Sequence, residues 1–345
     1  MKKLIRDPQL DDLVRELNQG DAEGAGWNAA GPAAAESIPA DNPLEHLLIE
    51  AVHRRASDLH IVAGAPPIFR IAGELMAADT APLSNDEIHT MLSELLGGRL
   101  SERLRSEGAV DFPLRLSRAA SEDDRRALRF RVNVHRQRGT LAAAIRALPS
   151  EVPTLKELGL PPVVAELVKA TRGLVLVCGP TGSGKTTTLA ALVGEVNRTH
   201  SRHIITIEDP IEYEHRNARC VIEQVEIGRD SPSFDAALRS ALRQDPDIIL
   251  VGEMRDLETV STALTAAETG HLILSTLHTS DVLQAIHRII DVFPPQQQTQ
   301  IRQQLALSLN AIIVQQLIPK PDGSGRSLAV ELILANQAVR NHIRN

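Results

Sequence analysis

Short apolar runs alternate with helical patterns through the second half of the chain. The runs have strand length and lie at residues 174–177, 203–207, 248–251 and 272–276. Between them apolar residues recur every three or four positions, as at Phe234, Leu238 and Ala241. This alternation predicts an α/β domain over residues 160–345, with a mainly parallel sheet sandwiched by helices. Ligands of such a sheet bind at the carboxyl ends of its strands.

Residues 43–149 show a different pattern. Pro43–Arg55 and Ser84–Leu96 have apolar residues at helical spacing, and Ser84 is followed by Glu87 in the arrangement of a capping box. Strand-like runs lie at residues 59–62, 67–71, 109–116, 128–135 and 141–148. We expect a smaller α+β domain, in which an antiparallel sheet carries two covering helices and a charged loop at Ser121–Arg126.

Segments rich in helix and strand breakers separate these units. Residues 1–42 contain a small, polar, glycine-rich stretch and are expected to form a flexible tail. Leucines near its start have helical spacing, so a short docking helix is the alternative to a frayed terminus. Prolines and polar residues from Pro149 onward predict a linker over residues 150–159.

Composition disfavours several classes of function. The chain has 345 residues, a net charge of −7 and only 2% aromatic residues, which disfavours nucleic acid as the main partner. No apolar stretch reaches the roughly 18 residues of a membrane span, so we expect a cytoplasmic protein without direct membrane insertion. Cys178 and Cys220 are the only cysteines and form no C-x-x-C pair, so no zinc site is expected.

A phosphate-binding motif follows the first apolar run of the second domain. Gly179–Thr186 reads G-x-x-x-x-G-K-T, where a strand, a glycine-rich turn and a helix start together direct backbone N–H groups at one point. Lys185 supplies a charge for the β- and γ-phosphates, and the Thr186 hydroxyl suits Mg²⁺. The motif predicts binding of a nucleoside triphosphate with Mg²⁺. The expected binding residues are Gly179, Pro180, Thr181, Gly182, Ser183, Gly184, Lys185, Thr186 and Thr187.

Acidic and polar residues end the neighbouring strands. Hydrolysis of a phosphoanhydride needs a group that orients water and a cation beside the phosphates. Glu253 suits the first role, and Glu212 suits Mg²⁺ or its waters. For either acid the alternative is a solvated loop or an ion pair with an arginine such as Arg255 or Arg243. His278 ends a further strand, where a purely structural role is equally open.

These residues resemble a family. Leu242–Asp256 matches the signature of the type II secretion and type IV pilus motor ATPases, and three further boxes follow in the family's order. Those boxes are Gly179–Thr186, Ile207–Glu212 and Ser275–Thr279. The resemblance covers about residues 43–345, includes Arg129–Asn133 in the first domain, and favours the PilT-type retraction ATPases.

The resemblance implies a homohexamer with ATP held between subunits. In such rings a PAS-like first domain packs against the RecA-like ATPase domain of its neighbour. The residue matching Glu253 is the catalytic carboxylate, those matching Glu208 and Glu212 form an acidic box near Mg²⁺, and the one matching His278 faces the γ-phosphate.

Related motors also use two arginines of the first domain, fifteen residues apart, to reach the phosphates. Arg131 and Arg146 have this spacing and lie on adjacent predicted strands. Surface charges on an antiparallel sheet are the alternative interpretation.

The sequence departs from the general pattern in the acids and the cysteines. Gly252 precedes Glu253 where a general phosphate-loop enzyme carries Asp, which leaves Mg²⁺ ligation to Glu208, Asp209 or Glu212. The tetracysteine insertion of the assembly and secretion classes is absent, which favours the retraction class.

The C-terminal segment also differs from that of the family. Ala338–Asn345 resembles the retraction class's A-I-R-N-L-I-R-E motif, and the sequence ends there, so we expect a shortened helical end. The apolar run Ala329–Leu334 is expected to complete the core, and Ala338–Asn345 to form an exposed helix. Substituting Arg340 and Ile343 is then expected to spare ATP turnover and abolish retraction.

Together these features favour a hexameric motor that hydrolyses ATP to retract a type IV pilus. It would act on a platform protein of the inner membrane, at the cytoplasmic face and through that partner. Three alternatives stay open. They are an assembly or secretion motor of the same superfamily, a nucleic-acid translocase on a RecA-like core, and a non-hydrolysing scaffold.

Overall fold

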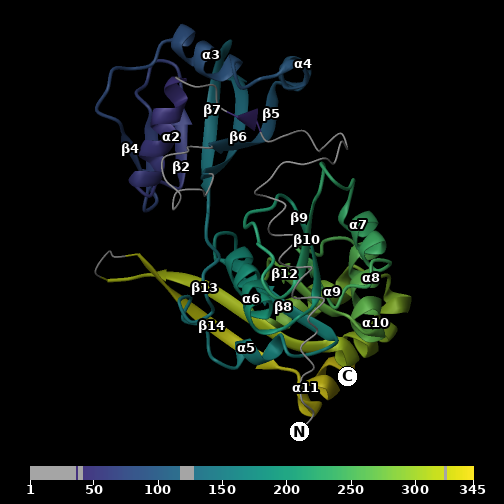
Figure 1. The fold of residues 1–345 in the computed structure, drawn as a ribbon. Coiled ribbons are helices and arrows are strands. Elements are labelled where there is room, and N and C mark those ends of the chain that lie inside the picture. Colours follow the sequence, from purple (N-terminus) through teal and green to yellow (C-terminus); the bar gives the residue numbers. More distant parts are fainter. Residues whose placement is uncertain (1–35, 38–41, 117–127, 322–324) are drawn as a thin grey trace. The chain divides into compact units, whose positions relative to one another are not determined.

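The computed structural model describes residues 36–37, 42–116, 128–321 and 325–345 (Figure 1). It divides into a smaller unit within Ala29–Ser150 and a larger unit that begins at Glu151. Most of the predicted tail and the predicted loop Ser121–Arg126 lie outside the described residues. No helix among the described residues is long and apolar enough to cross a membrane.

The smaller unit is built on a sheet in the order β1-β5-β6-β7-β2-β3-β4, antiparallel except for the β1–β5 pair. Its strands are β1 (Glu36–Ser37), β2 (Asp58–Ile61), β3 (Ile68–Ile71), β4 (Glu74–Ala77), β5 (Ala109–Leu116), β6 (Leu128–Gln137) and β7 (Thr140–Leu148). Its helices are α2 (Pro43–His53), α3 (Asn85–Ser93) and α4 (Gly98–Glu107).

The core of the smaller unit lies between one face of this sheet and the helices. β5 alternates buried and exposed residues, and its buried positions pack with side chains such as Phe69, Phe130 and Leu48. The five predicted strand runs are confirmed, as is the capping box at Ser84 and Glu87. The expectation of two helices is wrong, because α4 is a third. Leu100 and Leu104 are the only large apolar residues of α4, and two such positions are too few to mark a helix in the sequence.

The larger unit has a sheet in the order β10-β9-β11-β12-β8-β13-β14. All neighbours are parallel except β13 and β14. The strands are β8 (Gly173–Cys178), β9 (His203–Glu208), β10 (Val221–Glu226), β11 (Ile248–Val251), β12 (Leu272–Leu277), β13 (Leu309–Pro319) and β14 (Arg326–Leu334). The helices are α5 (Val164–Leu167), α6 (Lys185–Thr199), α7 (Phe234–Ala241), α8 (Leu257–Thr269), α9 (Val282–Asp291), α10 (Pro295–Ser308) and α11 (Gln337–Arg344).

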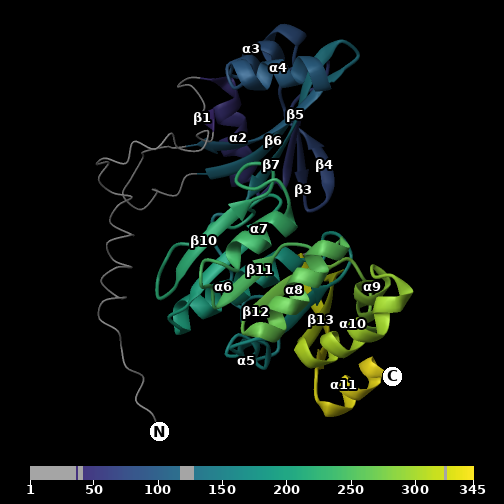
Figure 2. The same cartoon turned by 90° about the vertical axis from the view of Figure 1, so that its right-hand side faces the viewer.

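Helices cover both faces of this second sheet (Figures 1 and 2). Alternate residues of β8 point to opposite faces, where Val175 packs with apolar residues of α6, and Leu176 packs with those of α8 and α10. Both faces of β8 are therefore shielded from water, and every residue of this strand is buried. The predicted α/β fold with a mainly parallel sheet is confirmed.

The C-terminal end differs in part from its prediction. Ala329–Leu334 belongs to the edge strand β14, whose side chains are only partly buried. α11 forms as predicted, but the expectation that it is exposed is wrong for three residues. Val339 is partly buried and packs against the main core. Ile343 is 3% exposed and belongs to the main core, and the Arg340 guanidinium donates hydrogen bonds to the carbonyls of Ala306 and Leu307.

Candidate nucleotide-binding site

The phosphate loop lies at the carboxyl end of β8, near the middle of the larger sheet. The φ values of Gly179, Gly182 and Gly184 are 147°, 77° and 88°. Residues other than glycine rarely adopt such backbone conformations. A Cβ at Gly179 would also lie 2.3 Å from the carbonyl oxygen of Gln315. Helix α6 begins at Lys185 with Gly184 as its N-cap, so the positive end of its dipole faces the loop.

Lys185 extends its ammonium group back over this loop. Its Nζ donates to the carbonyl oxygens of Gly179 and Pro180, at 2.9 and 3.0 Å, and lies 3.4 Å from Nδ1 of His278. Burial lowers the pKa of Lys185, and the charge of Glu253 opposes that shift. The Lys185 amine therefore lies over the centre of the loop.

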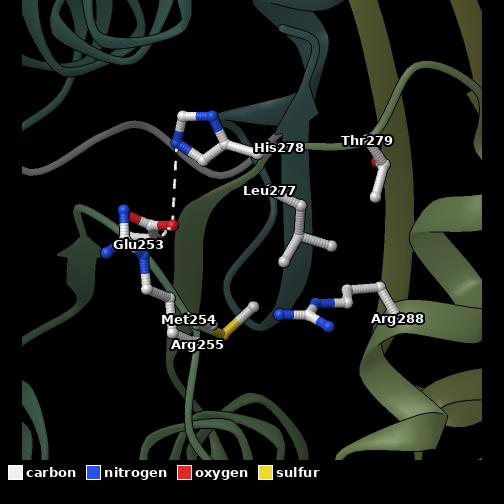
Figure 3. A pocket seen from close by; sticks show the side chains of 7 residues that line it. All are labelled: Glu253, Met254, Arg255, Leu277, His278, Thr279 and Arg288. Atoms are coloured by element: carbon white, nitrogen blue, oxygen red, sulfur yellow. Dashed lines mark hydrogen bonds and ion pairs between the residues drawn. The ribbon is translucent and has the colours of Figure 1, made fainter. Parts of the chain in front are cut away.

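Glu253, Arg255 and His278 line a pocket of about 380 Å³ beside the loop. Figure 3 shows His278 facing Glu253, with Arg255 next to the carboxylate. His278 Nε2 lies 3.6 Å from Glu253 Oε1, and Arg255 Nε donates to the same oxygen. The ion pair with Arg255 that the sequence left open is therefore present. This ion pair leaves Glu253 accessible, because the carboxylate also faces His278 and lines the pocket.

Two hydroxyls of β12 hold the end of β11, from which Glu253 follows. Ser275 Oγ donates to the Val251 carbonyl at 2.7 Å, and Thr276 Oγ1 donates to the Gly252 carbonyl at 2.6 Å. A Cβ at Gly252 would lie 3.1 Å from the carbonyl oxygen of Ile207 on β9. A side chain at this position would press on β9, so glycine suits the close approach of the chain to β9 here.

The acidic residues at the end of β9 and just after it differ in their surroundings. Glu208 is buried and accepts hydrogen bonds from Thr206 Oγ1 at 2.7 Å and Gln224 Nε2 at 3.2 Å. Burial raises its pKa. Glu212 is partly buried and Asp209 is exposed. The described residues contain no group of three or more His, Cys, Asp or Glu that could hold a metal ion.

The sequence patterns did not identify three side chains that support the phosphate loop and Glu208. Gln315 of β13 contacts Ser183 and Thr188, and the Tyr213 hydroxyl donates to Thr187 Oγ1 at 3.1 Å. Gln224 holds Glu208 and donates to the Tyr213 carbonyl. None of the three belongs to a recognisable motif, because each acts through tertiary contacts that join separate parts of the chain.

The two predicted arginines lie on the smaller unit. Arg131 and Arg146 are direct partners across β6 and β7, so their side chains share one face of the sheet. Arg146 Nε donates to Asp58 Oδ1 at 2.9 Å, and Arg131 Nε lies 3.7 Å from Asp111 Oδ1. Burial would raise the pKa of Asp58, but hydrogen bonds from Arg146 and Ser57 outweigh it and lower that pKa.

Comparison with known proteins places this chain in a family. Residues 33–343 match the family described as type II/IV secretion system protein. The type IV pilus retractation ATPase PilT of Pseudomonas aeruginosa is 44% identical over 301 residues, which covers 87% of this chain and 85% of that protein. A twitching motility protein of Neisseria gonorrhoeae is 43% identical over 283 residues, covering 82% of this chain and 74% of that protein.

Solved structures agree with this assignment. A crystal structure of the pilus retraction motor PilT with bound ADP has a TM-score of 0.80 and 48% identity, and covers 87% of this chain and 85% of that chain. The Legionella pneumophila ATPase DotB has a TM-score of 0.78 and 29% identity, with coverage of 89% and 86%. The chain therefore belongs to the type II/IV secretion system protein family, with PilT-type retraction ATPases among its near relatives.

Proposed function

We propose that this protein is an ATPase that powers retraction of a type IV pilus. The observation that carries the proposal is the convergence of Lys185, His278 and Glu253 at the carboxyl ends of β8, β12 and β11. A cation over the phosphate loop, an imidazole and a carboxylate within one small region are what phosphoryl transfer to water requires. The similarity to retraction ATPases supports the biological role.

The loop residues bind the nucleotide. Backbone N–H groups of Gly179–Thr187 and the α6 dipole hold the phosphates, and Lys185 contributes the point charge. Glu253 orients water and accepts its proton. His278 lies between Lys185 and Glu253, where it contacts the terminal phosphate.

Mg²⁺ fits the oxygen donors near the loop. Mg²⁺ uses few protein ligands and keeps several waters, so a large cluster of ligating side chains is not needed. The Thr186 hydroxyl and the carboxylates of Asp209 and Glu212 would hold the ion or its waters, and the buried Glu208 would add a further carboxylate. When bound, it neutralises part of the charge on the phosphates.

The active assembly is a homohexamer. In it the PAS-like first domain of one subunit brings Arg131 and Arg146 to the ATP of a neighbour. The ring works at the cytoplasmic face of the inner membrane, where it acts on a platform protein of the pilus machinery.

A deletion strain tests the biological role. Loss of twitching together with excess surface pili would support retraction. Loss of pili would support an assembly motor instead. A translocase would be supported if DNA or RNA stimulated ATP turnover by the purified protein and this stimulation fell steeply with salt concentration.

A further inference from the structure

A buried glutamine of β13 supports the phosphate loop from the side. Gln315 is 2% exposed, and its Nε2 donates to the Ser183 carbonyl oxygen at 2.7 Å. Its Oε1 accepts a hydrogen bond from Thr188 Oγ1, in the first turn of α6, at 2.9 Å. One side chain from a distant strand therefore contacts both the glycine-rich turn and the helix that follows it.

These two contacts fix which way the amide group faces. The Ser183 carbonyl can only accept, so it requires the NH₂ end of Gln315. The Thr188 hydroxyl is buried and donates to the opposite end. A reversed amide would place two carbonyl oxygens against each other, so the network has one stable arrangement.

The orientation of the Ser183 carbonyl sets that of the Gly184 N–H. Both groups belong to one planar trans peptide unit and therefore point in opposite directions. Gln315 lies on the carbonyl side of this unit, which directs the Gly184 N–H away from β13 and to the other side of the loop. Backbone N–H groups of this turn are the ones that hold phosphates.

Gln315 also lies where β13 leaves the centre of the sheet. The pairing of β13 with β8 ends at Val314, and from Gln315 onward β13 pairs only with β14. The backbone carbonyl of Gln315 meanwhile packs against Gly179, at the start of the loop. Gln315 of β13 thus lies against the phosphate loop at two places, Gly179 and Ser183.

We propose that Gln315 is a positioning residue for nucleotide binding. It holds the Ser183–Gly184 peptide so that the Gly184 N–H is available to the phosphates before ATP or ADP binds. The inference rests on the proposed nucleotide binding and adds a residue from outside the phosphate-loop motif.

The test replaces the amide by an apolar group of similar length. Gln315→Met removes both hydrogen bonds and should raise the Kd for ATP and for ADP about tenfold, since each neutral hydrogen bond contributes modestly. KM should rise in parallel, while kcat at saturating ATP stays within about twofold, because no group that contacts the reacting atoms has changed. Gln316→Met is the matched control, as its side chain is exposed on the next position of the strand. It should leave Kd and KM unchanged.

A second variant guards against a folding defect. Thr188→Val keeps the shape of the side chain and frees the Gln315 amide to rotate, so its Kd should rise about threefold. Combining both substitutions should cost little more than Gln315→Met alone, because they break one network. A Kd within experimental error of the parent for folded Gln315→Met would overturn the inference. If that variant does not fold, an unchanged Kd for Thr188→Val would overturn it. A parent protein that binds no nucleotide would instead overturn the proposed function.

Discussion

At the scale of single residues, His278 connects the two charges of the site. Its Nδ1 faces the Lys185 ammonium at 3.4 Å, and its Nε2 faces the Glu253 carboxylate at 3.6 Å. Burial lowers the pKa of His278, and the Lys185 charge lowers it further. The neutral imidazole with its proton on Nε2 suits this position, because Nδ1 can then accept from the Lys185 ammonium while the Nε2–H faces the carboxylate.

Replacing Glu253 tests its role in hydrolysis. Glu253→Gln should bind Mg-ATP about as well as the parent and hydrolyse it at least ~100-fold more slowly, because it keeps the shape but loses the base. Nucleotide affinity and ATP turnover are the measurements. Turnover above half of the parental value would contradict the assignment.

Lys185→Ala provides a contrast of a different kind. It removes the charge from the loop, so nucleotide affinity should fall together with turnover. An unchanged affinity would show that the ammonium does not contact the phosphates.

The protein should lose stability in mild acid because of His215. Burial lowers its pKa from 6.5 to about 4, so the folded protein keeps it neutral while the unfolded chain takes up a proton below pH 6.5. The free energy of unfolding should therefore fall as the pH drops from 6.5 to about 4. Urea unfolding at pH 7.5 and 5 measures this change. His215→Gln should make the fall smaller, and an identical fall in both proteins would refute the assignment.

At the scale of elements, α11 stabilises the end of α10. The Arg340 guanidinium donates to the carbonyls of Ala306, Leu307 and Ala335. The first two lie in the last turn of α10 and have no partner within their own helix. Ile343 anchors the same helix in the core. This segment is therefore part of the fold, whatever it also contacts.

Substitutions in α11 should separate its structural and its exposed positions. Ile343→Ala should lower the free energy of unfolding by about 2–4 kcal/mol, because it empties a buried site. Arg340→Ala should also destabilise, through the carbonyls it leaves unpaired. Arg344 is exposed on the same helix, so Arg344→Ala should leave the melting temperature and ATP turnover unchanged. Equal melting temperatures for all three variants would contradict this account.

At the scale of the whole molecule, the proposed catalytic residues belong to two different units of the chain. Glu253 follows β11 of the larger unit, whereas Arg131 and Arg146 lie on β6 and β7 of the smaller one. Both arginines are substantially exposed, at 45% and 63%, which leaves their guanidinium groups accessible beside their acidic partners. A ring that joins these units across a subunit boundary would make each site depend on two chains.

Mixing two inactive proteins tests this dependence. Glu253→Gln chains and Arg131→Ala/Arg146→Ala chains should each lack activity, and mixed rings should recover part of it, because some boundaries then carry both native halves. ATP turnover of the mixture against the separate proteins is the measurement. Arg136→Ala on the same sheet is the control and should stay active alone. Activity of the double variant by itself would mark both arginines as surface charges.

The local sequence determined much of the fold and the centre of the site. Mainly apolar runs of four or five residues identified β8, β9, β11 and β12, because a strand buried on both faces needs mostly apolar residues. The conformation of the loop glycines is also a local property. Their positive φ angles are ones that residues with a side chain rarely adopt. Element types and the phosphate loop are therefore local properties.

The tertiary structure alone decided which distant residues meet. Gln315 contacts the phosphate loop only because β13 lies beside β8 in the sheet. Arg340 donates to the end of α10 only because α11 packs against that helix. Ile343 and Val339 share one face of α11, and that face is buried only because the helix packs against the main core; the other positions of α11 are mostly polar. A buried polar group needs a partner, and that partner is fixed by how the elements pack, which no local pattern of residues encodes.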